Sequence, residues 1–394
     1  MLNQSAVNGI MQDETALSNT QNQLSTGLSI NTPADNPAGA VQLLQLTNTD
    51  SQYQQYVSNG QSANTNLTLE EQALSSSTTT LQSIRDLVVQ ANSASNSTAD
   101  LKDIATQISA LESQLQGTAN SQNAQGDYLF SGFSSGTQPF VRGSSGAMAY
   151  VGDSGASSVP LNGGTSVQTG DPGSAVFMNI PTGNGTFTTA ASASNTGSGV
   201  VDAGTVTNQA NWVPGQYTIT FSDASDYTVT DGTGATVTTG TYNASNGGSV
   251  VFDGVEVGIT GAPAAGDKFT VSSSGTQSVF DTLDNLVSSL NNAGSSSASR
   301  AQLSSSLGGA LQQVGQALNQ VSTVTSNVGS RISLISSVND TLSSATVTIQ
   351  TQISNLSSLD YAAATSQYSQ EYVALQAAEQ SYADINQLSL FKYL

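Results

Sequence analysis

Residues 307–356 have the sequence LGGALQQVGQALNQVSTVTSNVGSRISLISSVNDTLSSATVTIQTQISNL, and one apolar line runs through the whole stretch. Its positions alternate four and three residues apart: Leu307, Leu311, Val314, Leu318, Val321, Thr325, Val328, Ile332, Ile335, Asn339, Leu342, Thr346, Ile349, Ile353 and Leu356. An alternation sustained this long predicts a single helix that packs along a narrow seam, as in a coiled coil. Among the polar interruptions, Asn339 either fixes the register of the seam or is an ordinary tolerated position.

A second long helix is expected in the first quarter of the chain. It begins near Pro37, because Asn36 is a good N-cap residue and proline fits the first turn of a helix. Two neighbouring lines with a period of seven then continue for roughly 55 residues, on the order of 80 Å of helix. The first line holds Leu46, Tyr53, Gly60, Leu67, Leu74, Leu81 and Val88, and the second adds Tyr56, Ala63, Ile84 and Ala91.

Shorter apolar patterns predict four further helices. They lie at residues 2–28, where Ile10, Leu17 and Leu24 are seven apart, at 98–125, at 279–290, and from Tyr361 towards the end of the chain. Between about residues 137 and 275 glycine is dense and short alternating runs predict an inserted β domain. The expected strands are Gln216–Phe221, Asp226–Thr230, Thr236–Tyr242, Ser249–Phe252, Val255–Thr260 and Lys268–Val271. Asp253-Gly254 is a strong hairpin signal, whereas residues 143–211 form either a second lobe or ordered loops.

The predicted fold class is α+β multidomain: an antiparallel, coiled-coil-like rod of long helices formed by both termini, with an inserted β-rich domain. Because the chain leaves and re-enters the same β domain, both termini should meet at one end of the rod. We expect terminal polymerisation helices at 1–28 and 370–394, a helical rod domain at 29–136 and 276–369, and a surface-exposed β domain at 137–275.

The composition excludes several classes of function. With 7 Lys and Arg against 27 Asp and Glu, the formal net charge of -20 leaves no basic stripe for nucleic acid or an anionic membrane surface. The sequence contains no His and no Cys, which removes Ser-His-Asp and Cys-His nucleophiles and HExxH zinc sites. We therefore expect no catalytic, metal or cofactor site. Asp223, Asp226 and Asp231 lack the spacing of an EF-hand loop and are expected to lie in turns.

The apolar residues near both ends are candidates for contacts between subunits. A thin pair of terminal helices offers these residues little to pack against, so we hypothesise that neighbouring subunits bury them. The residues of this polymerisation interface are Val7, Ile10, Leu17, Leu24, Leu28, Tyr382, Ile385, Leu388, Leu390, Phe391 and Leu394. The alternative is that both ends fold back onto the helices of the same chain.

Several stretches resemble the signature of bacterial flagellins and their relatives. Residues 23–31 (QLSTGLSIN) and 34–39 (ADNPAG) are similar to the amino-terminal motif, and residues 359–362 (LDYA) to the carboxy-terminal one. Residues 126–133 (GDYLFSGF) and the ending QLSLFKYL resemble the hook-associated branch of the family. The motif positions carried over are Leu24, Gly27, Asn31, Asp35, Pro37, Gly39, Leu129, Phe130, Ser131, Gly132, Asp360 and Tyr361.

This resemblance implies a self-assembling, non-catalytic subunit that joins the hook of the flagellum to its filament. The implied partners are further copies of the chain in a ring or helical lattice, a neighbouring hook-associated protein, flagellin subunits on the filament side, and an export chaperone at the carboxy-terminal helix. The implied location is extracellular, after export through the flagellar type III apparatus. Family members usually begin several residues upstream of the position of Met1.

Three other interpretations stay open. A flagellin-like filament subunit would share the helices but not the GDYLFSGF stretch. A secreted binding module would need exposed aromatic residues on the β domain, where Trp212 is the single tryptophan and Tyr217, Tyr227 and Tyr242 fit strand packing. An enzyme within residues 137–275 would have to rely on a pair of carboxylates, because the chain has no histidine.

Overall fold

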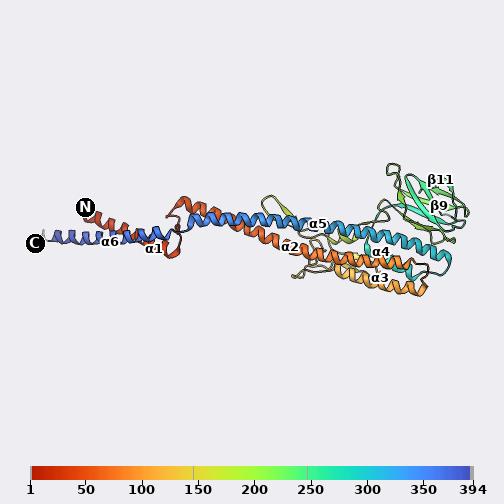
Figure 1. Ribbon diagram of the computed structural model, residues 1–394, viewed down its shortest axis with the longest axis horizontal. Helices are drawn as coiled ribbons and strands as arrows, with labels where there is room; N and C mark the ends of the chain where they lie inside the picture. The colour runs from red at the N-terminus through yellow and green to blue at the C-terminus, as the bar shows by residue number, and fades with distance from the viewer. Residues whose placement is uncertain (1, 145, 246, 391–394) are drawn as a thin grey trace. The chain divides into compact units, whose positions relative to one another are not determined.

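The computed structural model describes residues 2–390 except Ser145 and Asn246, and of residues 2, 3 and 385–390 it describes the backbone alone. Helices carry both ends of this described chain (Figure 1). They are α1 (Leu2–Thr26), α2 (Pro37–Ala91), α3 (Thr98–Ala119), α4 (Val279–Asn291), α5 (Ser297–Ser357) and α6 (Tyr361–Leu390), with a short π-helical turn, η1 (Ser174–Met178). The predicted class, helical at both ends and β-rich in the middle, is confirmed.

The strands all lie between α3 and α4. They are β1 (Phe140–Arg142), β2 (Met148–Tyr150), β3 (Ser158–Pro160), β4 (Ser166–Gln168), β5 (Ile180–Pro181), β6 (Phe187–Ala191), β7 (Val200–Val201), β8 (Thr205–Val206), β9 (Gln216–Phe221), β10 (Asp226–Thr230), β11 (Thr236–Thr241), β12 (Gly248–Phe252), β13 (Val255–Thr260), β14 (Lys268–Ser273) and β15 (Thr276–Gln277). The six expected strands correspond to β9 through β14, to within two residues at each end.

The chain divides into two compact units, which we describe separately. Unit 1 comprises residues 1–60, 161–164 and 336–394, and unit 2 comprises residues 61–160 and 165–335. Both long helices, α2 and α5, therefore contribute to both units. All fifteen predicted seam positions of α5 are buried or half-buried, as are the eleven of α2. The two long seams are thus confirmed, because period-seven apolar spacing selects one face of each helix for packing.

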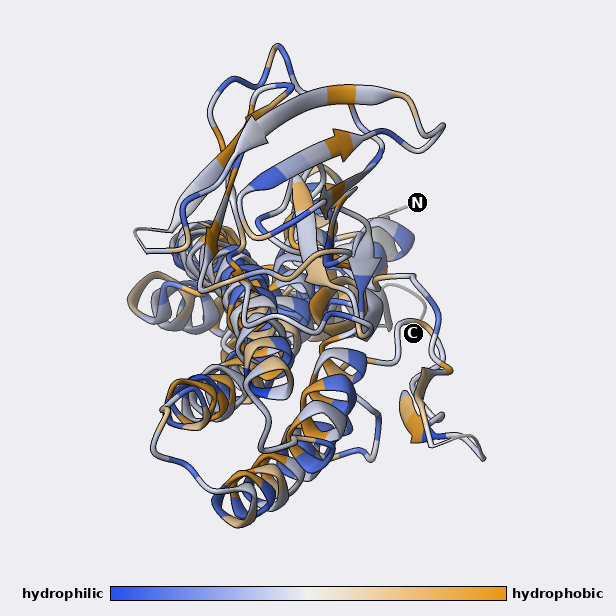
Figure 2. Ribbon diagram, turned by 90° about the vertical axis from the view of Figure 1, so that its right-hand side faces the viewer, coloured by the Kyte–Doolittle hydropathy of each residue, from blue (hydrophilic) through white to orange (hydrophobic). Residues whose placement is uncertain are grey.

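Two antiparallel sheets form the β domain of unit 2. One has the strand order β11-β10-β9-β14-β6, and the other the order β12-β13-β7, with β8 also paired to β13. Alternate side chains of β9 (Tyr217, Ile219 and Phe221) are buried and join residues of both sheets in one core cluster. Figure 2 shows hydrophobic and hydrophilic positions interspersed along the helices and strands. The predicted Asp253-Gly254 hairpin is confirmed, since both residues have positive φ (43° and 78°) between β12 and β13.

The expectation for residues 143–211 needs correction, because this segment is shared between two structures. Its second half supplies β6, β7 and β8 to the two sheets. Part of its first half packs on the helices of unit 2, where Phe177 of η1 meets Phe130, Phe140 and, on α4, Phe280 at ring-centroid distances of 5.4–6.2 Å. Residues 161–164 belong to unit 1. Isolated aromatic residues show no periodicity, so the sequence pattern did not reveal this core.

Helix α3 ends at Ala119, earlier than the predicted Gln125. The side chain of the next residue, Asn120, makes two hydrogen bonds to the backbone of Phe140 in β1. Its Nδ2 donates to the carbonyl of Phe140 (2.8 Å), and its Oδ1 accepts the N–H of the same residue (2.9 Å). These tertiary hydrogen bonds compete with continued helix and terminate it.

Candidate functional site

The terminal helices α1 and α6 pack against each other in opposite directions within unit 1 (Figure 1). On α6 the less exposed side chains recur four and three residues apart: Ala364, Tyr368, Glu371, Leu375, Ala378 and Tyr382. Among the described side chains of the two helices, only Thr20 and Ala364 are buried, at 2% and 5% exposure. Within the described part of the chain, this pair therefore packs without a buried core of large apolar residues.

Most predicted interface residues on this pair are only half covered. Val7, Ile10, Leu17, Leu24 and Tyr382 are half-buried, and Leu28 is 41% exposed. The side chains of Ile385, Leu388 and Leu390, and the whole of Phe391 and Leu394, lie outside the described residues. Their expected role in assembly stays a prediction.

Sequence reasoning missed three exposed apolar residues on the same helices. These are Met11, Tyr372 and Val373, at 59%, 47% and 63% exposure. Each of them lies off the seven-residue lines, which is why a search for periodicity passed over them. Together with the half-buried residues they widen the apolar surface of the terminal pair.

In unit 1 the helical chain is interrupted twice, once near each end of the sequence, and the two interruptions lie next to each other. We call this place the joint. It consists of residues 27–36, between α1 and α2, and residues 358–360, between α5 and α6. The amide of Ser29 donates to the carbonyl of Ser357 (2.7 Å), and the amide of Leu359 donates to the carbonyl of Gly27 (3.0 Å). The two breaks are therefore tied together by main-chain hydrogen bonds.

The joint corrects one predicted boundary. The division expected between residues 369 and 370 falls inside α6, since the helix break lies earlier, at 358–360. The Oδ1 atom of Asp360 accepts the amides of Ala362 and Ala363 (3.0 and 3.1 Å) and so caps the start of α6. This cap lies where the predicted seam ends at Leu356 and the next predicted helix begins at Tyr361.

The amino-terminal half of the joint is ordered by two short polar side chains. Asp35 accepts the amides of Asn31 and Thr32 with its Oδ2 atom (2.9 and 2.7 Å). The hydrogen bonds from the backbone amides of Thr32 and Asn31 hold the pKa of Asp35 below its usual value. Asn36 accepts the amide of Gly39 (2.9 Å), which confirms its predicted role as the N-cap of α2.

Gly27 and Tyr361, which belong to motifs at opposite ends of the sequence, meet in the joint. Gly27 has φ +73°, and a Cβ atom there would lie 2.7 Å from the hydroxyl oxygen of Tyr361. Glycine is therefore required both by the left-handed backbone and by the close approach of the tyrosine ring. The structure thus brings together the motif positions Gly27, Asn31, Asp35, Pro37, Gly39, Asp360 and Tyr361 in unit 1.

Of the remaining motif positions, Leu24 of α1 also belongs to unit 1, whereas Leu129 to Gly132 belong to unit 2. Phe130 is fully buried in the aromatic cluster, and the hydroxyl of Ser131 donates to the carbonyl of Tyr128 (2.9 Å). Gly132 has φ +73° and packs directly against Asp153. These residues fold a tight loop, so their spacing reflects local structure and not a reactive site.

Asn339 and Gly60 face each other on α5 and α2 in unit 1. A Cβ atom at Gly60 would lie 2.5 Å from the Oδ1 of Asn339, and that oxygen is buried without a hydrogen-bond partner. A buried polar atom without a hydrogen bond costs stability and gives this alignment of the two helices no polar contact that would select it. The register-fixing role of Asn339 therefore stays a prediction.

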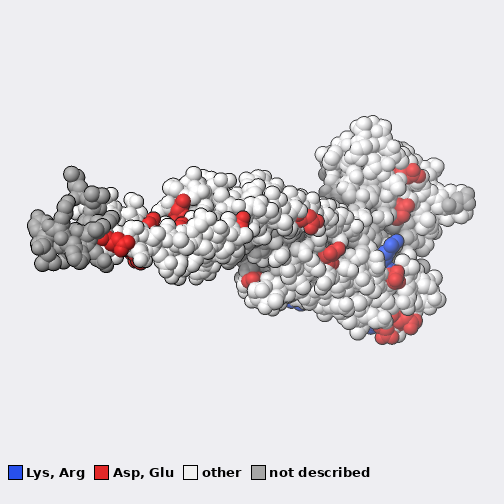
Figure 3. Space-filling model, turned by 60° about the vertical axis from the view of Figure 1, so that its left-hand side comes forward, with Lys and Arg blue, Asp and Glu red and all other residues white. Residues whose placement is uncertain are grey.

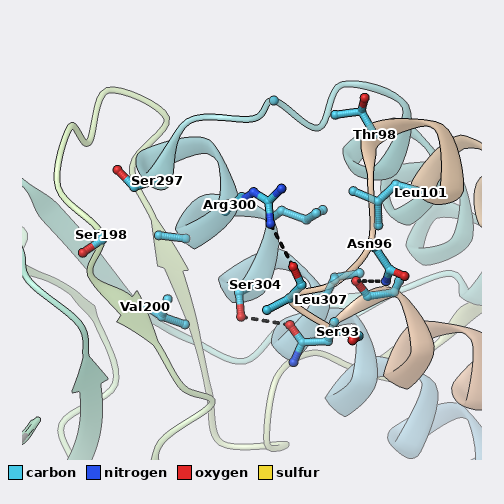
Figure 4. Close-up of a pocket in the computed structure, with 16 residues that line it drawn as sticks. Ser93, Asn96, Thr98, Leu101, Ser198, Val200, Ser297, Arg300, Ser304 and Leu307 are labelled. Carbon is cyan, nitrogen blue, oxygen red and sulfur yellow. Dashed lines mark hydrogen bonds between the residues drawn. The ribbon is translucent and has the colours of Figure 1, made fainter.

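A pocket of about 260 Å³ opens in unit 2 where the ends of α2, α3 and α5 meet (Figure 4). Its polar side chains hold the turn between α2 and α3: Arg300 donates to the carbonyl of Ala94 (3.0 Å), and Ser304 donates to Asn92 (2.9 Å). The sixteen described lining residues include neither carboxylate nor histidine. The pocket therefore offers no general acid or base, and its polar groups are used for structure.

Two arginines of unit 2 are bound to carboxylates on several elements. Arg142 of β1 contacts the buried Glu112 of α3 and also Asp284 of α4 (3.0 Å). Burial, and then the charge of Asp284, raise the pKa of Glu112, which Arg142 partly offsets. Arg331 of α5 binds Asp171 with both terminal nitrogens (2.8 and 3.0 Å). Two of the few cationic side chains thus attach β1 to α3 and α4, and Asp171 to α5.

The rest of the surface is sparsely charged, and Figure 3 shows scattered acidic groups with few basic ones on the face in view. Within the described residues, no group of three acidic or histidine side chains is arranged to hold a metal ion, and no helix has the length and hydropathy of a membrane span. Asp223 and Asp231 accept backbone amides of the turns that follow them, which confirms their predicted place in turns. The same expectation was wrong for Asp226, which is the first residue of β10.

Family comparisons match both ends and the middle of the chain. Residues 1–135 match the bacterial flagellin N-terminal helical region, and residues 311–394 match the bacterial flagellin C-terminal helical region. Residues 190–273, which contain the end of β6 and all of β7 to β14, match the D2-like domain of flagellar hook-associated protein 1.

Individual proteins of similar sequence and structure carry related names. FlgL of Xanthomonas campestris is 33% identical, with a TM-score of 0.73, over 79% of this chain and 99% of that one. The flagellar junction protein FlgL of Legionella pneumophila is 32% identical, with a TM-score of 0.70, over 75% of this chain and 99% of that one. Flagellar hook-associated protein 3 of Escherichia coli (strain K12) is 29% identical over 46% of this chain and 56% of its own length. The chain thus spans about half the length of that curated relative.

Proposed function

This chain belongs to the flagellin family, in the group of flagellar hook-associated protein 3, and we propose that it is a structural subunit at the junction between hook and filament. The observation that carries the proposal is the terminal pair, α1 and α6, whose described large apolar side chains stay half-buried or exposed. Assembly into a lattice would complete the burial that the isolated chain lacks, with apolar contact as the driving force. In this proposal the terminal helices polymerise, the long helices support them, and the β domain faces outward.

The joint gives this subunit a way to fit two different neighbours. Both breaks lie at one level and are bonded to each other, so α1 and α6 can turn together as one body. A small change of backbone angles in residues 27–36 and 358–360 would then redirect the polymerising pair. Such adjustment suits a ring that contacts a hook-associated protein on one side and flagellin on the other.

The β domain also favours the hook-associated group over a filament subunit. Its match to a domain of hook-associated protein 1 covers the two sheets. The aromatic residues that a ligand-binding module would expose are largely packed inside: Tyr217 and Tyr242 are buried, and Trp212 stacks between Phe187 and Tyr217. This packing supports a structural role for the domain.

Deletion of the gene in its source organism tests the proposal. We expect hooks without filaments, and flagellin released into the medium, by electron microscopy and protein gels of cells and culture fluid. Normal filaments on the deletion strain would refute the junction role.

Complementation of the deletion strain with variant genes distinguishes a defect in the assembly surface from a defect in folding. The double variant Leu17→Ser and Leu24→Ser, in half-buried positions of α1, should fold but fail to restore filaments. The matched control is Val251→Ser on β12, which is 54% exposed and should restore them. Equal filament numbers with both variants would show that the terminal pair is not the assembly surface.

We further propose export through the flagellar type III apparatus and a chaperone that covers the carboxy-terminal helix, as an amphipathic helix held in a groove. The support is the apolar spacing of Tyr361, Tyr368, Leu375 and Tyr382 along α6. Truncation of residues 381–394 should abolish binding to that chaperone in a pull-down with purified components. Unchanged affinity of the truncated chain would contradict the idea.

A further inference from the structure

Glu70 is a charged residue type in an apolar position of α2. It lies on the second seam line, seven residues after Ala63, and its neighbours on the seam, Leu67 and Leu74, are fully buried. Glu70 itself is 1% exposed. A carboxylate removed from water to this degree needs a hydrogen-bonded cation or a bound proton.

The contacts of Glu70 provide no cation of its own. Its Oε1 accepts the backbone amide of Asp171 (3.1 Å), whereas its Oε2 is buried without a hydrogen-bond partner. The nearby guanidinium of Arg331 spends both terminal nitrogens on the carboxylate of Asp171. Asp171 therefore occupies the single arginine of this cluster, and Glu70 keeps one carboxylate oxygen that makes no hydrogen bond.

Three separate parts of unit 2 meet at this cluster. Glu70 comes from α2, Arg331 from α5, and Asp171 from residues 169–173, the segment that links β4 to η1. That segment is also tied to the GDYLFSGF loop, since Gly173 donates to the carbonyl of Phe130 (2.8 Å). Asp171 thus holds the segment between the two long helices.

The electrostatic balance favours a bound proton on Glu70. Burial first, and then the negative charge of Asp171, raise its pKa to about 8, while the hydrogen bond from the backbone amide of Asp171 and then the charge of Arg331 act in the opposite direction. At pH 7 the acid form would therefore outnumber the carboxylate by roughly ten to one. A polar cavity of about 240 Å³, lined by Asn66, Asp127 and Asp171 among others, lies beside the cluster and gives water a place from which to exchange the proton.

We propose that Glu70 is a proton-operated latch, in which the protonated side chain holds residues 169–173 between α2 and α5 and the loss of its proton releases that segment. The ionised form places a second negative charge beside Asp171, where Arg331 is the facing cation. Repulsion and the cost of a buried charge then oppose the Glu70–Asp171 contact. This inference concerns unit 2 alone and holds whether or not the chain acts at a junction.

Linkage fixes the sign of the expected pH dependence. The pKa of Glu70 is higher in the folded chain than its ordinary value of 4.5, so the stabilisation is complete below pH 4.5 and is lost as the pH rises towards 8. Over that range, the unfolding constant of the wild type relative to Glu70→Gln should grow up to about tenfold per pH unit. The amide of glutamine imitates the neutral acid and cannot ionise.

The experiment compares hydrogen exchange of residues 165–175 in the full chain between pH 6 and pH 9, as protection factors corrected for intrinsic rates. We expect the protection factors of the wild type to fall as the pH rises from 6 to about 8 and to level off above it, those of the Glu70→Gln variant to stay constant, and the exposed-neighbour control Glu71→Gln to behave as the wild type. Equal pH profiles of wild type and Glu70→Gln would overturn the proposal.

A second variant keeps the proposal testable if Glu70→Gln does not fold. Glu70→Met has similar length and no charge, and its protection of residues 165–175 should be lower than in the wild type but independent of pH. A fall of protection between pH 6 and about pH 8 in this variant would assign the effect to another group and overturn the latch. Infrared spectra of the wild type should show a protonated carboxyl band at pH 7 that vanishes by pH 9 and is missing from Glu70→Met.

Discussion

The same seven-residue spacing has two different outcomes on α2 in unit 2 and on α6 in unit 1. In unit 2 the seam residues Leu67, Leu74 and Leu81 of α2 are completely buried. In unit 1 the seam residues Leu375 and Tyr382 of α6 are only half-buried, although their spacing is equally regular. The comparison teaches that periodicity identifies the apolar face of a helix, whereas burial depends on how many layers cover that face.

The apolar face of the terminal pair in unit 1 is not covered by a further layer of helices or strands. This difference explains why the two units should respond differently to the same substitution. Unit 2 adds α3, α4, an aromatic cluster and two sheets to the long helices. The terminal pair of unit 1 has two helices and, in its described part, small buried residues. We therefore expect unit 2 to carry the stability of the isolated chain and unit 1 to carry its capacity to assemble.

The largest expected effect is a matched pair of leucine truncations. Leu81→Ala in unit 2 removes a fully buried side chain and should cost about 2–5 kcal/mol of unfolding free energy, whereas Leu24→Ala in unit 1 should cost about 1 kcal/mol or less. Calorimetry of the monomer measures both. In a polymerisation assay the order should reverse, with Leu24→Ala the more harmful. Equal costs in the monomer would mean that the terminal pair is folded back onto other parts of the chain.

The next effect tests how unit 2 keeps its buried charges. Arg331→Met removes the partner of Asp171, whose side chain is 14% exposed, and should cost about 3 kcal/mol because a buried carboxylate loses its cation. Arg85→Met on the exposed face of α2 is the control and should change stability by less than about 0.5 kcal/mol. Chemical denaturation at pH 7 gives both values. A neutral result for Arg331→Met would show that methionine packing replaces the ion pair.

Much of the architecture followed from short-range patterns in the sequence. The long helices, the strands from β9 to β14 and the Asp253-Gly254 turn depend on spacing and on turn chemistry, which are local properties. The candidate assembly surface on α1 and α6 was predicted less completely. Val7, Ile10 and Leu24 were identified as apolar, yet their half-buried state depends on what else packs on α1, which no local pattern contains.

Two parts of the structure depend on contacts between distant residues. The aromatic cluster joins Phe130 to Phe280, and the joint places Gly27 under Tyr361, so neither has a periodic signal. Glu70 was not predicted as a site, although it is an acidic residue on the same line as Ala63, Ile84 and Ala91. Several positions of the short motifs lie in the joint, but its geometry came only from the structure.

A smaller effect should appear in the joint on substitution of Gly27. Gly27→Ala places a methyl group in a left-handed backbone position and against the hydroxyl of Tyr361, which should cost about 1–2 kcal/mol. The control is Gly9→Ala in α1, where the added Cβ meets nothing within 4 Å and should stabilise the helix by up to about 1 kcal/mol. Thermal unfolding of the terminal helices followed by hydrogen exchange distinguishes the two. Partial rescue of Gly27→Ala by Tyr361→Phe would identify the hydroxyl contact as the cause.

The smallest expected effect is a pH dependence confined to the joint. Because the pKa of Asp35 is lower in the folded chain than its ordinary 3.8, its contribution is present above pH 3.8 and is lost as the pH falls through the folded value. Acidification should therefore reduce the hydrogen-exchange protection of the Asn31 and Thr32 amides in the wild type. Asp35→Asn should show weaker protection from the outset and little further loss. Asp100→Asn, in the capping box of α3 in unit 2, is the matched control, since its pKa is lowered by equivalent hydrogen bonds from Ser97. It should leave the joint unchanged, and a loss of protection at Asn31 in that variant would mean that the two units do not respond independently.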